Sequence, residues 1–141
     1  MTIARYLVCY VAIALAFGAL DFAWLSFAGP NLYRPEIGTL LADKVRGLPA
    51  ALFYFIYIGG LTAFVALPAL DAGDWRQAFA RGAGFGLVAY AAYDLTNQAT
   101  LQVWSTRVTV CDLVWGAFAS ALAGGAGAWV TDFASRRLGW R

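Results

Sequence analysis

The chain has 141 residues, of which 62% are hydrophobic and only 13% are charged. Soluble domains carry about 45–50% apolar and about 25% charged residues, so this chain has too few charges to cover its surface in water. Together with a mean hydropathy of +0.66, this composition indicates an integral membrane protein with a single domain.

Net charge and ligand residues exclude several kinds of site. The net charge is +2, and the basic residues form no cluster beyond Arg136 and Arg137, which argues against a nucleic-acid partner. Histidine is absent, and Cys9 and Cys111 fall in different apolar segments. Because zinc, haem and iron–sulfur centres need several His or Cys ligands, we expect no metal and no cofactor.

Four apolar segments reach the length of about 20 residues that a bilayer-spanning helix needs. They cover residues 6–28, 49–70, 79–104 and 108–130. The first is longer than the apolar core of a cleaved signal peptide, so we interpret it as a retained helix. It is expected to stop at Gly29-Pro30-Asn31, with a short interfacial helix over residues 37–45. Tight second and third loops make the last three helices antiparallel neighbours. The predicted fold is all-α, a polytopic four-transmembrane-helix bundle.

Basic residues indicate the orientation of this bundle. The N-terminus, the second loop and the C-terminal tail hold six Lys and Arg residues, whereas the first and third loops hold four. Basic residues accumulate on the cytoplasmic side of inner-membrane proteins. The bias therefore favours cytoplasmic termini.

Three aspartates interrupt the apolar segments, namely Asp21, Asp94 and Asp112. A charged side chain at a helix centre costs roughly 2.5–3.5 kcal/mol on insertion scales, so such residues face a partner or a water-filled cavity. At 1.5 Å per residue they lie about 10, 15 and 6 Å from helix ends that share one membrane face. All three therefore fall in the same half of the bilayer, whichever way the protein is inserted.

The helical spacing directs these aspartates into the bundle. Gly86 and Tyr90 precede Asp94 at intervals of four, and Gly116 follows Asp112 at the same interval. Small residues at this spacing let membrane helices approach closely. We therefore expect an intramembrane ligand pocket with polar groups and aromatic walls. Its predicted residues are Asp21, Asp94, Asn97, Asp112, Tyr54, Tyr57, Tyr90, Trp104 and Trp115.

Several of these residues also have purely structural explanations. Asp112 near a helix N-terminus is favoured by the helix dipole, and Asp21 lies within two turns of an interface. Asn97 is equally explained by a hydrogen bond between helices. Asp94 is the deepest and the strongest functional candidate. Because neighbouring carboxylates in a low dielectric cannot all ionise cheaply, we expect Asp94 to be protonated, or partnered by Asn97, Tyr90 or a bound cation.

The pattern D-x-x-W-x-x-F-A occurs twice, at residues 21–28 and 112–119. It suggests a repeat, although a weak one in a chain rich in Ala and Phe. The same tryptophan motifs, together with "AYDLTNQAT" and the "FY--Y-GG" start of the second segment, resemble a known family. This family comprises predicted bacterial membrane proteins catalogued as domain of unknown function 2177. The resemblance covers nearly the whole chain and implies four helices in an inner membrane, with no established activity.

The expected function is to bind a membrane lipid or another amphipathic small molecule in the acid- and aromatic-lined pocket. One alternative is a small proton- or cation-coupled transporter that dimerises and uses Asp94, although the other half of the bundle has few polar groups. Another is a structural subunit of a larger membrane complex. A lipid-modifying enzyme ranks lower, because the sequence has no Ser-His-Asp arrangement and no phosphate-binding loop.

Overall fold

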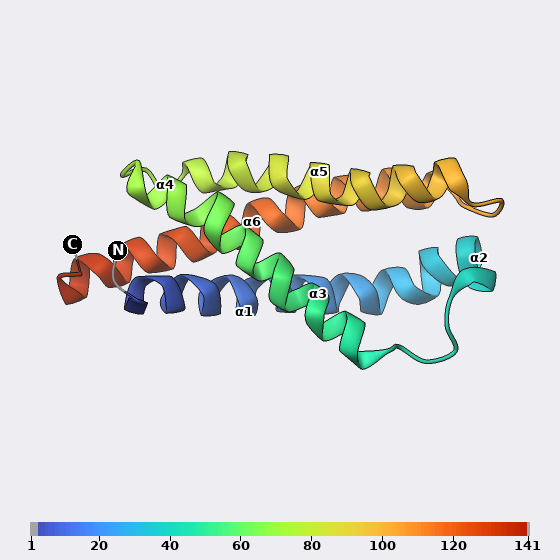
Figure 1. Ribbon diagram of the computed structural model, residues 1–141, viewed down its shortest axis with the longest axis horizontal. Coiled ribbons are helices and arrows are strands. Elements are labelled where there is room, and N and C mark those ends of the chain that lie inside the picture. Colours follow the sequence, from blue (N-terminus) through green and yellow to red (C-terminus); the bar gives the residue numbers. More distant parts are fainter. Residues whose placement is uncertain (1–2, 141) are drawn as a thin grey trace.

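The computed structural model describes residues 3–140, which are helical almost throughout (Figure 1). Arg141, one of the basic residues counted for the orientation, lies outside the described residues. No β-strand occurs between residues 3 and 140. In chain order the elements are α1 (Ile3–Ala28), η1 (Gly29–Tyr33), α2 (Arg34–Ile37), η2 (Gly38–Leu40), α3 (Gly47–Gly60), η3 (Leu61–Ala66), α4 (Leu67–Asp71), α5 (Gln77–Thr100) and α6 (Thr106–Leu138).

These elements form four long helical rods, because η1 and η3 are π-helical segments that continue the helices before and after them. Both termini and the turn between α4 and α5 lie at one end of the bundle, which we call the terminal end (Figure 1). The segment α2 and the connection from α5 to α6 lie at the opposite end, which we call the α2 end (Figure 1). The all-helical bundle expected from the sequence is therefore confirmed.

Three of the rods are long and apolar enough to cross a membrane. They cover Ile3–Leu40, Gly47–Asp71 and Thr106–Leu138. The helix α5 has a comparable length of 24 residues but is less apolar, since its last two turns carry a run of polar side chains. It pairs with α6 along most of its length (Figure 1).

Each π-helical segment lies just before a proline. Pro35 and Pro68 have no backbone N–H, and a proline ring inside a helix also collides with the carbonyl four residues earlier. In both rods the residue before the proline donates its N–H five residues back, from Arg34 to Gly29 O and from Leu67 to Thr62 O. The wider π turn accommodates the proline, so neither rod breaks there.

This continuation corrects the expected end of the first helix. The sequence Gly29-Pro30-Asn31 does not stop the rod, which turns through η1 and α2 as far as Ile37. The interfacial helix expected over residues 37–45 is also wrong, because only the 3₁₀ turn η2 is helical there and residues 41–46 are not helical. The consequence is that Tyr33 is carried on a rigid helical extension instead of a loop.

The third helix ends earlier than predicted, and the fourth is longer than predicted at both ends. Leu101 is extended (φ −96°, ψ 139°), and α6 begins at Thr106, where Ser105 accepts a hydrogen bond from the N–H of Val108. Trp104 therefore lies in the connection and not on α5. At the other end α6 reaches Leu138 and stops at Gly139, whose positive φ of 66° suits glycine.

The core is divided between the two ends of the bundle. Toward the terminal end, Ile13 and Phe17 of α1 pack with Leu61 and Val65 of η3, all of them almost fully buried. A smaller cluster at the α2 end contains Ala28, Leu32, Ile37 and Val108. The functional candidates lie between these two apolar clusters.

Candidate functional site

Close contact between α5 and α6 determines which of their side chains meet. A Cβ atom on Gly86 would collide with Gly116 O and Ser120 Oγ, and one on Gly116 would collide with the ring of Tyr90. These contacts fix an antiparallel register. Moving four residues forward along α5 corresponds to moving four residues back along α6. One step beyond Tyr90 and Gly116, the register pairs Asp94 with Asp112.

The carboxyl groups of Asp94 and Asp112 accordingly face each other across the helix pair. Asp94 is completely buried, no N–H or hydroxyl group of residues 3–140 donates to its carboxyl oxygens, and only the carboxyl group of Asp112 lies within hydrogen-bonding reach of them. The expected partners Asn97 and Tyr90 do not hydrogen-bond to it. An isolated carboxylate is too costly in such surroundings, so Asp94 must be neutral or wait for a donor that the chain does not supply.

Asp112 is better provided for, because two aromatic side chains form a relay to it. The Oη of Tyr33 donates to Asp112 Oδ1 at 2.6 Å, and the Nε1 of Trp24 donates to Tyr33 Oη at 2.9 Å. Tyr33 lies at the end of η1, which explains why the helical continuation beyond residue 28 matters. Asp112 keeps its second oxygen free of hydrogen bonds from residues 3–140.

The third aspartate is held by another tyrosine. The hydroxyl of Tyr54 on α3 donates to Asp21 Oδ2 on α1. One turn along α3, the hydroxyls of Tyr57 and Ser120 share a hydrogen bond of 2.7 Å. Asp21 and Asp112 are each only 6% exposed. The three aspartates thus lie on the inner faces of α1, α5 and α6, where α3 supplies tyrosine hydroxyls.

A cavity of about 440 Å³ opens beside this group. It lies between α3, α5 and α6, on the side where the start of α3 swings away from α5 (Figure 1). Two of its wall residues, Phe53 on α3 and Tyr93 on α5, are 42% and 61% exposed. The cavity therefore opens sideways, toward the region that lipid would occupy. Its lining residues are Phe53, Tyr57, Ala89, Tyr90, Tyr93 and Asp112.

The structure brings most of the predicted site residues together, but not all. Asn97 is half-buried one turn beyond Asp94 and outside the cavity wall. Trp104 donates from Nε1 to Thr109 Oγ1 at 2.9 Å and packs with the cluster at the α2 end. Trp115 does not line the cavity and stacks on Trp24 of α1.

The repeated D-x-x-W pattern acquires a structural meaning here. The indole rings of Trp24 and Trp115 stack in parallel, with centroids 4.7 Å apart and planes 8° apart. Because α1 and α6 are antiparallel, Trp24 lies beyond Asp21 toward the α2 end, whereas Trp115 lies beyond Asp112 toward the terminal end. The stack therefore separates Asp21, on the terminal side, from Asp112, on the α2 side.

Sequence reasoning missed Tyr33, Ser120, Tyr93 and Phe53. Tyr93 and Phe53 directly adjoin the predicted residues Asp94 and Tyr54. Helical spacing alone places them on the outward-facing side of their helices. Ser120 follows Gly116 at the same interval of four, so the spacing that directs Asp112 inward could have identified it. Tyr33 had no usable signal, since it follows a glycine and a proline that normally end a helix.

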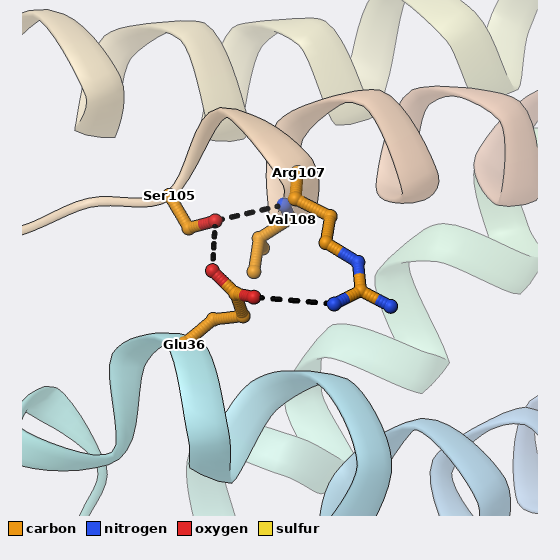
Figure 2. Close-up of polar contacts among 4 residues, drawn as sticks. All are labelled: Glu36, Ser105, Arg107 and Val108. Atoms are coloured by element: carbon orange, nitrogen blue, oxygen red, sulfur yellow. Dashed lines mark hydrogen bonds and ion pairs between the residues drawn. The ribbon is translucent and has the colours of Figure 1, made fainter.

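A polar contact at the α2 end ties the Tyr33-bearing segment to α6 (Figure 2). Ser105 Oγ, which caps α6, donates to Glu36 Oε2 at 2.6 Å, and Arg107 Nη1 lies 3.3 Å from Glu36 Oε1. Glu36 is one turn after Tyr33 in the chain. The contact thus positions Tyr33 relative to Asp112.

The three aspartates neighbour one another, but they do not converge on one point as metal ligands would. Among residues 3–140, no three His, Cys, Asp or Glu side chains lie close enough together to hold a metal ion. The chain therefore offers paired carboxyl groups at the cavity, Asp94 with Asp112, and a separate one at Asp21.

Comparison with known proteins identifies a family. No curated protein and no solved structure matches the chain. One family, described as "Predicted membrane protein (DUF2177)", matches residues 6–129, which include every side chain of the site. The chain therefore belongs to this DUF2177 family of predicted membrane proteins.

Proposed function

We propose that this inner-membrane protein binds an amphipathic small molecule of the lipid class in the cavity between α3 and α5. The polar end of the molecule would reach the Asp94–Asp112 pair, and its chain would extend through the sideways opening. The observation that carries the proposal is the state of Asp94, which is fully buried, faces another carboxyl group and receives no hydrogen bond from an N–H or hydroxyl group of residues 3–140.

A buried polar group without a partner destabilises a protein, by about 1–3 kcal/mol for each lost hydrogen bond and more for charged groups. Polar side chains inside membranes are for this reason functional candidates by default. Residues 3–140 give Asp94 no N–H or hydroxyl donor that would offset this cost. A buried carboxyl group in this state supports a role in holding something that is not part of the chain.

The size and shape of the cavity support a lipid-like ligand. Small-molecule sites commonly have volumes of about 300–1,000 Å³ with largely apolar walls and a few polar groups, which agrees with a cavity of about 440 Å³. Phe53 and Tyr93 at the mouth are exposed on the bundle surface. A ligand dissolved in the bilayer would enter between them without crossing water.

The apolar core toward the terminal end favours binding over transport. Phe17 and Leu61 are fully buried below the tyrosines, and Val65 is 1% exposed. These side chains belong to the apolar cluster toward the terminal end, and the buried hydroxyls of Thr62 and Thr131 in that half donate to carbonyls of their own helices. A transported ion or proton would meet no buried carboxyl or basic side chain among these residues.

Native mass spectrometry of the protein extracted from the membranes in which it is produced tests the proposal. We expect the wild type to retain a lipid-sized adduct and Asp112→Asn with Asp94→Asn to lose it. Asp132→Asn is the matched control, because Asp132 lies on the same helix, near its C-terminal end, in a surface ion pair with Arg136. Equal adducts in all three proteins, or none in the wild type, would refute the proposal.

A further inference from the structure

We infer that the cavity selects an ammonium head group, primary or quaternary, carried by a membrane-soluble chain. This inference rests on the proposed lipid-binding function and adds the chemistry of the head group. It is drawn from the charge around the cavity, the hydrogen-bonding capacity of its polar groups and its aromatic walls.

All charged groups at the cavity are acidic. Asp112 lines it, Asp94 faces Asp112, and Asp21 lies close enough to act electrostatically on both Asp112 and Tyr90. None of the lining residues is basic. Arg34 and Arg107 at the α2 end are exposed, and Arg107 pairs with Glu36. A phosphate or carboxylate would thus meet only like charge, whereas a cation would be attracted.

The charged part of the free hydrogen-bonding capacity consists of acceptors. The hydroxyls of Tyr33 and Tyr54 already donate to Asp112 and Asp21. Besides the hydroxyls of Tyr90 and Tyr93, which can donate or accept, there remain the second oxygen of Asp112 and both oxygens of Asp94. An ammonium group has only donors, up to three of them, and ionised carboxylates only accept. Such a pair forms charge-assisted hydrogen bonds, which are about twice as strong as neutral ones.

The cavity walls fit a cation as well. The rings of Tyr57 and Tyr90 meet edge to face, with centroids 6.3 Å apart and planes at 80°. The ring of Phe53 lies 5.3 Å from that of Tyr57, and Tyr93 closes the other side. Several aromatic rings around one space are the arrangement that binds ammonium ions by cation–π attraction.

Calorimetric titration of the delipidated protein in dodecyl maltoside micelles tests the inference with four probes of equal chain length. These are dodecylammonium, dodecyltrimethylammonium, dodecanol and dodecanoate. We expect either ammonium probe to bind at least about tenfold more tightly than dodecanol. Dodecylammonium can form charge-assisted hydrogen bonds, and dodecyltrimethylammonium, which has no N–H, is attracted by the carboxylate charge and the aromatic rings. Dodecanoate should bind most weakly.

Variants distinguish the site from general partitioning into micelles. Asp112→Asn should weaken ammonium binding about tenfold and leave dodecanol binding unchanged, and Asp132→Asn should change neither. Because Tyr93 is 61% exposed, its replacement does not threaten folding. Tyr93→Phe should keep ammonium binding, and Tyr93→Leu should weaken it about threefold through loss of cation–π attraction.

Phospholipids with identical acyl chains identify the source of the ammonium group. Displacement of dodecylammonium by phosphatidylethanolamine, but not by phosphatidylglycerol, would indicate a phospholipid amine. Failure of both to displace it would indicate a free single-chain amine.

The outcomes separate this inference from the proposed function. If dodecanol binds as tightly as the ammonium probes, and Tyr93→Leu weakens both, the cavity binds amphipathic molecules but the ammonium inference is wrong. If no probe binds above the level of Asp112→Asn, the ammonium inference is wrong. A copurified adduct lost on mutation of the aspartates would still support the proposed function.

Discussion

The two halves of the bundle use the same rods in opposite ways. Toward the terminal end, Gly124 lies against Val65 and Gly127 against Ile13, and this closed half is closely packed and mostly apolar, with the buried hydroxyls of Thr62 and Thr131 bonded within their own helices. Toward the α2 end, α3 leaves α5, a cavity opens, and carboxyl groups take the place of aliphatic side chains (Figure 1).

The difference shows how a membrane protein can retain an unpaired buried acid. Close packing through small residues on α5 and α6 fixes the register of both helices, and the same register delivers Asp94 to Asp112. Unfavourable groups persist at functional sites only when the surrounding structure stabilises them. The closed half, toward the terminal end, supplies that stability. The buried acid in the open half, toward the α2 end, depends on it.

The largest expected difference between the two ends of the bundle is the side of the membrane from which each end is accessible. In a variant with both native cysteines replaced, a cysteine at Asp43 and one at Asp74 should be labelled by a membrane-impermeant maleimide from opposite sides. Each should react fully from one side and not from the other, and we expect position 74 to be cytoplasmic. Labelling of both from the same side would contradict the four-pass arrangement.

Close packing between α5 and α6 should give the next largest effect, on the free energy of unfolding. Gly86→Val places a side chain against Gly116 O and Ser120 Oγ, and we expect it to lower the free energy of unfolding by about 3 kcal/mol. Gly84 is two residues away on α5 and has open space around it, so Gly84→Ala should be neutral or raise stability by about 0.5–1 kcal/mol. Thermal unfolding in detergent measures both. Equal destabilisation by the two changes would show that α5 and α6 are not in close contact.

Within the open half, the two facing aspartates should respond in opposite directions. Asp112→Leu leaves the hydroxyl of Tyr33 without its acceptor and should cost about 1–3 kcal/mol. Asp94→Asn strands no donor and gives the amide a hydrogen bond to Asp112, so it should raise stability by about 1 kcal/mol. Unfolding temperatures of the two variants, compared with wild type, would decide this. Destabilisation by Asp94→Asn would mean that Asp94 has a stabilising partner.

The contact at the α2 end should give the smallest effects (Figure 2). Ser105→Ala removes the cap of α6 and should cost about 1 kcal/mol. Arg107→Ala removes an exposed ion pair, in which the arginine side chain is 68% exposed, and should cost less than about 0.5 kcal/mol. Chemical unfolding of both variants provides the measurement. An order of effects opposite to this one would show that the ion pair, and not the cap, anchors α2.

Much of this fold could be predicted from hydropathy and spacing. Length and apolar composition gave the helices, and the four-residue intervals around Gly86 and Gly116 gave the face on which Asp94 meets Asp112. These features are local, since they depend on the period of one helix at a time. The placement of Asp21 near a tyrosine of the second rod followed from depth alone.

The parts that sequence could not provide depend on non-local or unusual backbone geometry. The residues around Pro35 do not predict that the helix continues, so Tyr33 could not be predicted as the partner of Asp112. Trp104 was assigned to a helix that ends four residues earlier, because an apolar run does not reveal where a neighbouring cap begins. The repeated D-x-x-W pattern could be interpreted as a stack of Trp24 on Trp115 only once the directions and contact of both helices were known.

The π-helical turn η3 has a consequence for how the chain tolerates changes in length. A π turn holds one residue more than the ordinary helical path, and each residue of an α-helix rotates its side chains by about 100°. Because the π turn absorbs its extra residue, deleting one residue from Leu61–Ala66 would restore a regular helix and leave the rotational phase of α3 relative to α4 nearly unchanged. Tyr54 would then stay at Asp21, and Tyr57 at Ser120. A deletion within the regular helix α3 itself would instead turn the residues before it by about 100°. The tolerance of this rod to a change in length is thus concentrated in one turn.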